Sequence, residues 1–254
     1  MPTTKTLAVH YLPQFVRESD LADGAAVVID LLRASTTICT ALAAGATEVT
    51  TFLEVADALR AAEAHAGDEP LMLGGERDGV IIPGFDLGNS PAEYTAQEVF
   101  GARVLFATTN GTRALAHARL ARRVLVGAIV NLSALVESLQ EEQSVHLLCA
   151  GTGGHVTRED QLAAGAIVDA LSQHGEWVLS QPAESVIGEW RELLTTARAL
   201  GRSTAEQLAL ELRDTPGGKN LIEIGMEDDL PRCAAIDTLT VVPEYDPATG
   251  RITT

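Results

Sequence analysis

The chain has 254 residues, of which 46% are hydrophobic, 21% charged and 4% aromatic, and this length can bury a full core without covalent staples. Its 18 basic and 35 acidic residues give a net charge of −17, which argues against a nucleic-acid partner because phosphate backbones attract basic surfaces. No apolar run approaches the about 20 residues of a membrane helix, no export signal opens the chain, and three distant cysteines exclude a disulfide framework or a four-thiolate zinc site, so we expect a cytoplasmic protein without a membrane partner.

Short runs of β-branched residues alternate with stretches rich in Ala and Leu through most of the chain. In chain order, the patterns predict a strand at Ala25–Ile29, a helix at Ser35–Ala44, a strand at Glu48–Phe52, a helix at Glu54–Ala66, strands at Leu71–Leu73 and Arg103–Ala107, a helix at Thr112–Ala121, a strand at Val124–Val126, a helix at Leu132–Gln140, a strand at Val145–Cys149, and helices at Glu159–His174 and Pro182–Ala199.

This alternation predicts the α/β class, as a three-layer α/β/α fold with a largely parallel or mixed sheet. No Gly/Ser-rich or Pro-rich linker divides the chain, so we expect one domain over residues 1–254, and the stretch near residues 130–145 allows a subdomain division. The segments VVIDLLRASTTICTALAAGA and LLCAGTGGHVTREDQLAAGAIV resemble each other, which allows two similar subdomains. The favoured interpretation is two βα units that are built alike.

The first strand, Ala25–Ile29, ends in a polar turn. Asp30 stands at its carboxyl end, and Arg33 follows where the next helix begins. In open parallel sheets ligands bind beyond the carboxyl ends of the strands, where helix N-termini also point. The hydroxyls of Ser35 and Thr36 are explained by helix capping, but a carboxylate and a guanidinium beside them favour a ligand site.

Two other strands end in turns of small and polar residues. The turn after RVLFA runs from Thr108 to Arg113 and contains Thr109, Asn110, Gly111 and Thr112. It could form an oxyanion cradle, and an ordinary Asn-Gly turn explains it equally well. The turn with Gly151 and Thr152 follows Cys149 and could bring backbone amides to an anion, although it is neither a Walker A loop nor a GxGxxG motif.

A long segment from Gly74 to Pro91 carries more glycines and charges than a simple connection needs. Long ordered loops of this kind usually close over a site. Its carboxylates Glu76 and Asp86, together with Asp30, are hard oxygen ligands, which suit Mg²⁺ better than zinc. The six histidines form no HExxH motif, so a histidine-built metal site is not expected.

Five segments together carry a family resemblance: VVIDLLRASTTICTALAAGA, GGERDGVIIPGFDLGNSPAEY, TTNGTRAL, CAGTGGHVTREDQLAAGAIVDAL and KNLIEIGMEDDLPRCAAID. In this order the chain resembles the 2-phosphosulfolactate phosphatase (ComB) family from about Ala25 to Pro243. GFDLGNSP combined with TTNGTRAL is the most specific part. One departure is Asp78, where the family commonly has Gly, and it adds a negative charge beside the expected anion site.

The resemblance implies a magnesium-dependent phosphoric monoester hydrolase that converts (2R)-2-phospho-3-sulfolactate to 3-sulfolactate and phosphate, a step toward coenzyme M. The implied partner is a small anionic organophosphate, which needs several cationic or amide donors, and Arg33, Arg77 and Arg113 lie in the matching motifs. The alternatives are a phosphatase of another small phosphorylated hydroxy acid and a non-catalytic binding protein for small anions. Chain size and apolar content allow a homodimer.

For this activity we assign catalytic roles to Asp30, Arg33 and Glu76. The candidate Mg²⁺ ligands are Asp30, Glu76, Asp86 and Asp160, although Asp160 is also explained as a first-turn acid that the helix dipole favours. The candidate substrate-binding residues are Ser35, Thr36, Arg77, Asn89, Ser90, Thr109, Asn110, Gly111, Thr112, Arg113, Gly151 and Thr152.

Three nucleophiles are considered, and a magnesium-activated water is favoured. An aspartyl-phosphate at Asp30 is less favoured because Leu32 stands where the DxDx[TV] signature has its second acid. Cys149 lacks the arginine of a Cx5R loop, since His155 takes that position, so a buried, inert thiol is expected. The acids Glu227–Asp229 are interpreted as N-terminal acids of a short helix.

Overall fold

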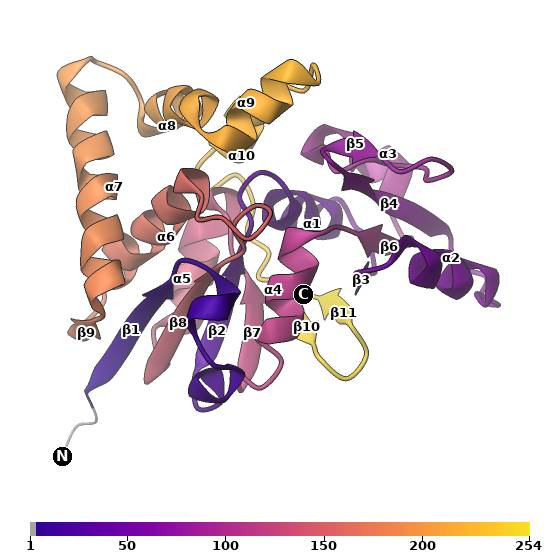
Figure 1. The fold of residues 1–254 in the computed structure, drawn as a ribbon, viewed down its shortest axis with the longest axis horizontal. Helices are drawn as coiled ribbons and strands as arrows, with labels where there is room; N and C mark the ends of the chain where they lie inside the picture. Colours follow the sequence, from indigo (N-terminus) through magenta and orange to yellow (C-terminus); the bar gives the residue numbers. More distant parts are fainter. Residues whose placement is uncertain (1–3) are drawn as a thin grey trace.

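The computed structural model of the protein describes residues 4–254. Eleven strands in this part of the chain form one sheet in the order β5-β4-β6-β3-β11-β10-β7-β2-β8-β1-β9 (Figure 1). The strands are β1 (Lys5–His10), β2 (Ala25–Ile29), β3 (Glu48–Phe52), β4 (Leu71–Arg77), β5 (Val80–Ile81), β6 (Arg103–Ala107), β7 (Arg123–Val126), β8 (Ser144–Cys149), β9 (Trp177–Leu179), β10 (Glu244–Asp246) and β11 (Arg251–Thr253).

Ten α-helices accompany the sheet in the described residues. They are α1 (Ala34–Ala43), α2 (Val55–Glu63), α3 (Ala96–Val99), α4 (Asn110–His117), α5 (Leu132–Leu139), α6 (Arg158–Leu171), α7 (Gln181–Ala199), α8 (Thr204–Asp214), α9 (Pro216–Glu223) and α10 (Asp229–Cys233). No helix in residues 4–254 combines the length and the apolar character that a bilayer crossing demands.

The sheet consists of two parallel runs that an antiparallel hairpin connects. In one run β7, β2, β8, β1 and β9 are parallel neighbours, and in the other β4, β6 and β3 are. The hairpin β10–β11 lies between β7 and β3 and is antiparallel to both. The hairpin pairs with each run over only one or two residues. Glu244 lies opposite Leu125 in β7, and Ile252 lies opposite Val49 in β3.

The burial pattern explains why β2 lies inside the first run. All five residues of β2 are buried, as in a parallel strand that is covered on both faces. The long helix α6 packs on β8 and β2 and buries most of its residues, while α2 packs on β3, β4 and β6. The predicted class is therefore confirmed as a large, mostly parallel sheet that helices flank.

The sequence patterns predict the central elements well and the terminal ones poorly. The strands β2, β3 and β6 have the predicted bounds. The expected strand Leu71–Leu73 continues to Arg77, so residues 74–77 are not part of a long loop. Gly74 and Gly75 pair with β6, and Glu76 and Arg77 pair with β5. The strands β1, β10 and β11 have no counterpart among the predicted elements, and β10 and β11 have three residues each, too few to show a period.

The domain organisation stays a prediction. Helix α5 occupies most of the stretch near residues 130–145, and β8, which follows it, pairs with both β1 and β2.

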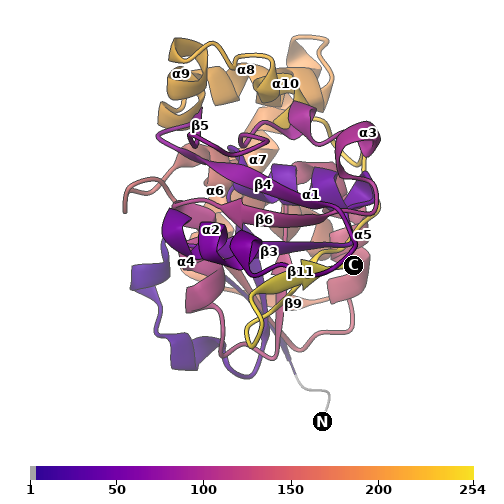
Figure 2. The same ribbon diagram turned by 90° about the vertical axis from the view of Figure 1, so that its right-hand side faces the viewer.

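The helices α8, α9 and α10 lie beyond the carboxyl ends of the central strands (Figure 1). Seen from the side, α9 lies close to the β4–β5 hairpin (Figure 2). Gly79 in the turn of this hairpin is tightly packed against α9. A Cβ at this position would lie 2.9 Å from the side-chain Nδ2 of Asn220 and 2.9 Å from the Cδ1 methyl of Ile224. The C-terminal helices thus form a wall above the edge of the sheet where ligands bind in α/β proteins.

Candidate active site

A polar cavity of about 400 Å³ lies beyond the carboxyl ends of four strands, two from each of the parallel runs. Asp30 and Arg33 follow β2, Glu76 belongs to β4, Asn110 follows β6 and Thr152 follows β8, and all five line this pocket. On the other side, α9 contributes Pro216, Gly217, Asn220 and Leu221. The structure therefore gathers residues from each of the predicted polar segments around one cavity.

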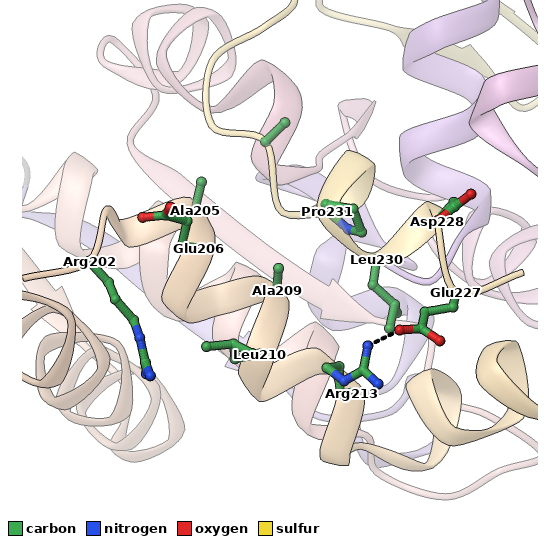
Figure 3. A pocket seen from close by; sticks show the side chains of 11 residues that line it. Arg202, Ala205, Glu206, Ala209, Leu210, Arg213, Glu227, Asp228, Leu230 and Pro231 are labelled. Carbon is green, nitrogen blue, oxygen red and sulfur yellow. Dashed lines mark hydrogen bonds and ion pairs between the residues drawn. The ribbon is translucent and has the colours of Figure 1, made fainter. Parts of the chain in front are cut away.

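A second cavity, of about 540 Å³, lies between α8 and α10 (Figure 3). Its surface is largely apolar, with Ala209, Leu210 and Leu230 along it, and an ion pair joins Arg213 and Glu227 at its edge. None of the predicted site residues lines this groove. The strand-end pocket is therefore the candidate active site, although it is the smaller of the two.

Hydroxyl groups hold the turn after β2 in place. The Asp30 amide donates to Ser35 Oγ at 2.9 Å, and Thr36 Oγ1 donates to the Leu31 carbonyl at 3.1 Å. Both hydroxyl residues are buried. Ser35 and Thr36 thus contact the backbone that presents Asp30, and neither lines the pocket.

Asp160 connects the ends of β2 and β8 from below the pocket. Its Oδ1 accepts from the Leu31 amide and its Oδ2 from the Gly151 amide, both at 2.9 Å. Burial raises the pKa of Asp160 to about 6 despite these hydrogen bonds. Both carboxylate oxygens of Asp160 thus accept backbone hydrogen bonds, so Asp160 holds the two turns together. The Gly151 amide is one of these donors.

Asp30 lies among other carboxyl groups. Burial raises the pKa of Asp30 well above its usual range, and the negative charges of Asp160 and Glu76 raise it further. Gly111, in the first turn of α4, lies against the same carboxylate, since a Cβ there would be 3.0 Å from Asp30 Oδ2. A glycine at this position lets the helix N-terminus approach the acid.

Glu159, which no motif singled out as a site residue, lies directly beneath the pocket wall. It is buried, its Oε2 has no hydrogen-bond partner in the described residues, and burial followed by the charge of Asp160 raises its pKa to about 7. A Cβ on Gly217 would lie 2.6 Å from its Oε1. The only sequence signal was its position in the first turn of a helix, where acids are common for dipole reasons alone.

The Arg33 guanidinium is buried and held by two other segments. Its Nη1 donates to Asp229 Oδ2 at 2.6 Å, and its Nη2 donates to the Gly79 carbonyl at 2.8 Å. The hydroxyl of Ser90 donates to the second oxygen of Asp229 at 2.7 Å. Asp229 is therefore not merely a first-turn acid of α10, and Ser90 contacts this ion pair.

Four other predicted site residues do not line the pocket. Arg77 donates to the carbonyls of Leu53, Glu76 and Ala107. Asp86 accepts from the Leu73 amide at 2.8 Å and is exposed, and Arg113 is also exposed. Asn89 is buried, its carbonyl accepts from Thr37, and its side-chain oxygen has no partner in residues 4–254.

The turn after β6 meets the turn after β8. Asn110 Oδ1 accepts from the Gly153 amide at 3.2 Å, and Thr109 lies beside it in the pocket. Thr112 is buried and forms a 3.0 Å hydrogen bond with Thr108, so its hydroxyl supports the turn. Asn110 and Thr109 are thus the members of this motif that can contact a ligand.

Cys149 is buried and does not line the pocket. Burial, followed by the charges of Asp160 and Glu159, raises the pKa of its thiol well above the usual range. A protonated, inaccessible thiol fits the expected inert role.

The donor set of the pocket fits Mg²⁺ in the mode that uses few protein ligands. In residues 4–254 no three His, Cys, Asp or Glu side chains gather closely enough to hold a metal ion unaided. Mg²⁺ commonly binds through one or two carboxylates, several waters and substrate phosphate oxygens. Asp30 and Glu76 line the pocket and could supply those carboxylates, with Glu76 Oε2 also accepting from the Gly79 amide at 2.7 Å.

Comparison with known families decides the relationship. The model of the family described as 2-phosphosulpholactate phosphatase matches residues 10–247. The chain belongs to this family. The resemblance predicted from the five segments is thereby confirmed over nearly the whole sequence.

Individual relatives of the family cover most of the chain. A probable 2-phosphosulfolactate phosphatase of Symbiobacterium thermophilum is 41% identical over 227 residues, which is 89% of this chain and 93% of the relative. Proteins with the same description from Synechococcus sp. (strain RCC307) and Gloeobacter violaceus are 39% and 34% identical, and each comparison covers at least 94% of this chain and 96% of the relative.

Proposed function

We propose that this protein is a magnesium-dependent phosphatase that hydrolyses (2R)-2-phospho-3-sulfolactate to 3-sulfolactate and phosphate. Family membership over residues 10–247 supports the reaction. The observation that carries the proposal is the single pocket that combines Asp30, Glu76, Arg33 and Asn110 from strand ends far apart in the sequence. We further propose that the product lies on a route to coenzyme M, as the family resemblance implies.

The charge of the pocket supports a role for a divalent cation. Its ionisable lining residues are Asp30, Glu76, Asp78 and Arg33, and the charge of Arg33 is already compensated by Asp229. Such a pocket repels an organophosphate that also carries a carboxylate and a sulfonate. Mg²⁺ held by Asp30 and Glu76 would neutralise charge on the transferring phosphoryl group and polarise it.

The residues of the chain then have distinct tasks in the reaction. Hydrolysis forms a bond from a water oxygen to phosphorus, breaks the bond from phosphorus to the C2 oxygen, and leaves the free alcohol and phosphate. We assign Arg33 and Asn110 to orienting the anionic groups, because both line the pocket with donor atoms. Asp30 would accept the proton of the attacking water through the oxygen that does not hold Mg²⁺ and return it to the C2 oxygen as the alcohol leaves.

Phosphate release from synthetic 2-phosphosulfolactate tests the proposal. The wild-type protein should release phosphate with Mg²⁺, and EDTA should abolish the release. Asp30→Asn and Glu76→Gln should each lower kcat/KM by at least about 100-fold, the lower range for loss of an acid–base or electrostatic group. Asp68→Asn removes a carboxylate that is exposed on the turn before β4, and it should keep the wild-type rate.

Three outcomes would overturn the proposal. Wild-type turnover by Asp30→Asn would show that the reaction does not occur in this pocket. Faster hydrolysis of 2-phospholactate, which lacks the sulfonate, would assign the enzyme to another phosphorylated hydroxy acid. Ligand-induced thermal stabilisation without any phosphate release would indicate a binding protein.

We further infer a cytoplasmic location and a homodimer. The low cysteine content supports the first, since the three cysteines are free and buried. Size-exclusion chromatography with light scattering measures the second.

A further inference from the structure

Asp229 stands out because it is a buried acid with every oxygen in use. Its side chain is 2% exposed, its Oδ2 accepts from Arg33, and its Oδ1 accepts from Ser90. It comes from α10, while Arg33 follows β2 and Ser90 follows the β4–β5 hairpin. One carboxylate thus contacts two segments that lie 196 and 139 residues before it in the chain.

The second contact of Arg33 fixes its orientation. The guanidinium is a rigid planar fork, and its two terminal nitrogens bond to Asp229 on α10 and to the Gly79 carbonyl in the hairpin turn. Two hydrogen bonds from different nitrogens determine the plane of the group. Arg33 nevertheless lines the pocket, and two hydrogen bonds leave part of its five N–H groups for a ligand.

The ion pair also sets the charge that a phosphate meets. The remaining ionisable residues of the pocket lining are the acids Asp30, Glu76 and Asp78. A buried ion pair is weakly screened, so removing the charge of Asp229 changes the potential at the pocket more than removing an exposed charge does.

We propose that Asp229 is a positioning residue of the active site, which orients the Arg33 guanidinium toward the phosphoryl group and limits the positive charge that Arg33 offers to it. This inference rests on the proposed function for the identity of the reaction. Its two parts have separate consequences, since orientation acts on turnover and charge acts on the affinity for phosphate. The inference does not depend on the organic part of the substrate.

Asp229→Asn separates charge from shape. The amide is nearly isosteric and its oxygen can still accept from Arg33, but the negative charge is gone. We expect kcat to fall at least tenfold, because a neutral acceptor holds the guanidinium less firmly than a carboxylate. Orthophosphate should bind at least threefold more tightly in calorimetry with Mg²⁺ present, because Arg33 keeps its full charge.

Asp228→Asn is the matched control. Asp228 precedes Asp229, is exposed, and lines the outer groove between α8 and α10 (Figure 3). The variant removes the same charge one residue away, and it should keep kcat and orthophosphate affinity within twofold of the wild type. If Asp228→Asn and Asp229→Asn change kcat and orthophosphate affinity equally, the effect comes from the overall charge of the protein, and the proposal is wrong.

Ser90→Ala provides a test that preserves both charges. It removes the hydrogen bond to Asp229 Oδ1, so kcat should fall several-fold while orthophosphate affinity stays within twofold. If Asp229→Asn does not fold, Ser90→Ala tests the proposal by itself, and an unchanged kcat in Ser90→Ala contradicts the positioning role. If Asp229→Asn folds but keeps the wild-type kcat and orthophosphate affinity, the positioning role is also contradicted.

The orthophosphate-binding measurement tests this inference independently of the proposed substrate. If the wild-type protein does not hydrolyse 2-phosphosulfolactate, the proposed substrate is wrong. Orthophosphate binding then still tests Asp229, because tighter binding in Asp229→Asn than in Asp228→Asn supports its control of Arg33, and equal binding refutes it.

Discussion

His10 and His146 form a hydrogen-bonded pair on the neighbouring strands β1 and β8, with 3.1 Å between His10 Nε2 and His146 Nδ1. Burial, then the charge of His146, lowers the pKa of His10 from 6.5 to about 4. Between pH 6.5 and about 4, His10 is therefore protonated in the unfolded chain and neutral in the folded chain. The stability that neutral His10 contributes is complete above pH 6.5 and is lost as the pH falls toward 4.

Thermal unfolding of His10→Gln checks this residue-scale prediction. Between pH 6.5 and about 4, the midpoint of the variant should fall less than that of the wild type, because glutamine does not titrate. His174→Gln changes an exposed histidine and should follow the wild-type curve. Parallel curves for His10→Gln and the wild type would contradict the prediction.

At the level of secondary-structure elements, the C-terminal hairpin β10–β11 contributes strongly to stability although it has only six strand residues. It joins the two parallel runs of the sheet, and Ile252 in β11 is fully buried opposite Val49. Ile252→Ala should lower the free energy of unfolding by about 2–5 kcal/mol, through lost burial and the cavity that remains. Urea denaturation measures this loss. Thr253→Ala, at an exposed position of the same strand, should cost at most about 0.5 kcal/mol, and an equal loss for both would refute the role of Ile252.

At the scale of the whole molecule, the net charge of −17 makes the folded state repel itself. Raising NaCl from about 10 mM to about 150 mM shortens the screening length from about 30 Å to about 8 Å. The midpoint of thermal unfolding should therefore rise, and KCl at the same ionic strength should have the same effect. A midpoint that falls with salt would show that attractive ion pairs, such as Arg103 with Glu48, outweigh the repulsion.

The fold class and much of the site could be predicted from local patterns. Continuous apolar runs such as Ala25–Ile29 identify buried parallel strands, and polar residues directly after such a strand lie at its carboxyl end, where ligands bind in α/β proteins. Asp30, Asn110 and Thr152 follow from this rule, and Glu76 from the glycine-rich segment that carries it. The structure brings all four into one pocket, although β2 and β8 belong to one parallel run and β4 and β6 to the other.

The arginines show where local reasoning ends. Arg33, Arg77 and Arg113 are equivalent as motif members, yet Arg33 lines the pocket, Arg77 bonds to backbone carbonyls and Arg113 is exposed. The direction of a long side chain depends on which carbonyls and carboxylates pack around it, and those come from distant segments. Asp86, likewise, bonds to the Leu73 amide because the two sides of its own loop meet.

The α/β class, the family and the strand ends with polar residues can all be predicted from the amino-acid sequence, because they depend on periodicity and on residue order along the chain. Three features become visible only in the folded chain: α9 closes the pocket, Asp229 holds Arg33, and Glu159 is buried beneath Gly217. The reason is physical: these contacts join residues up to 196 positions apart, and such pairings arise from packing of the folded chain, which no local pattern records.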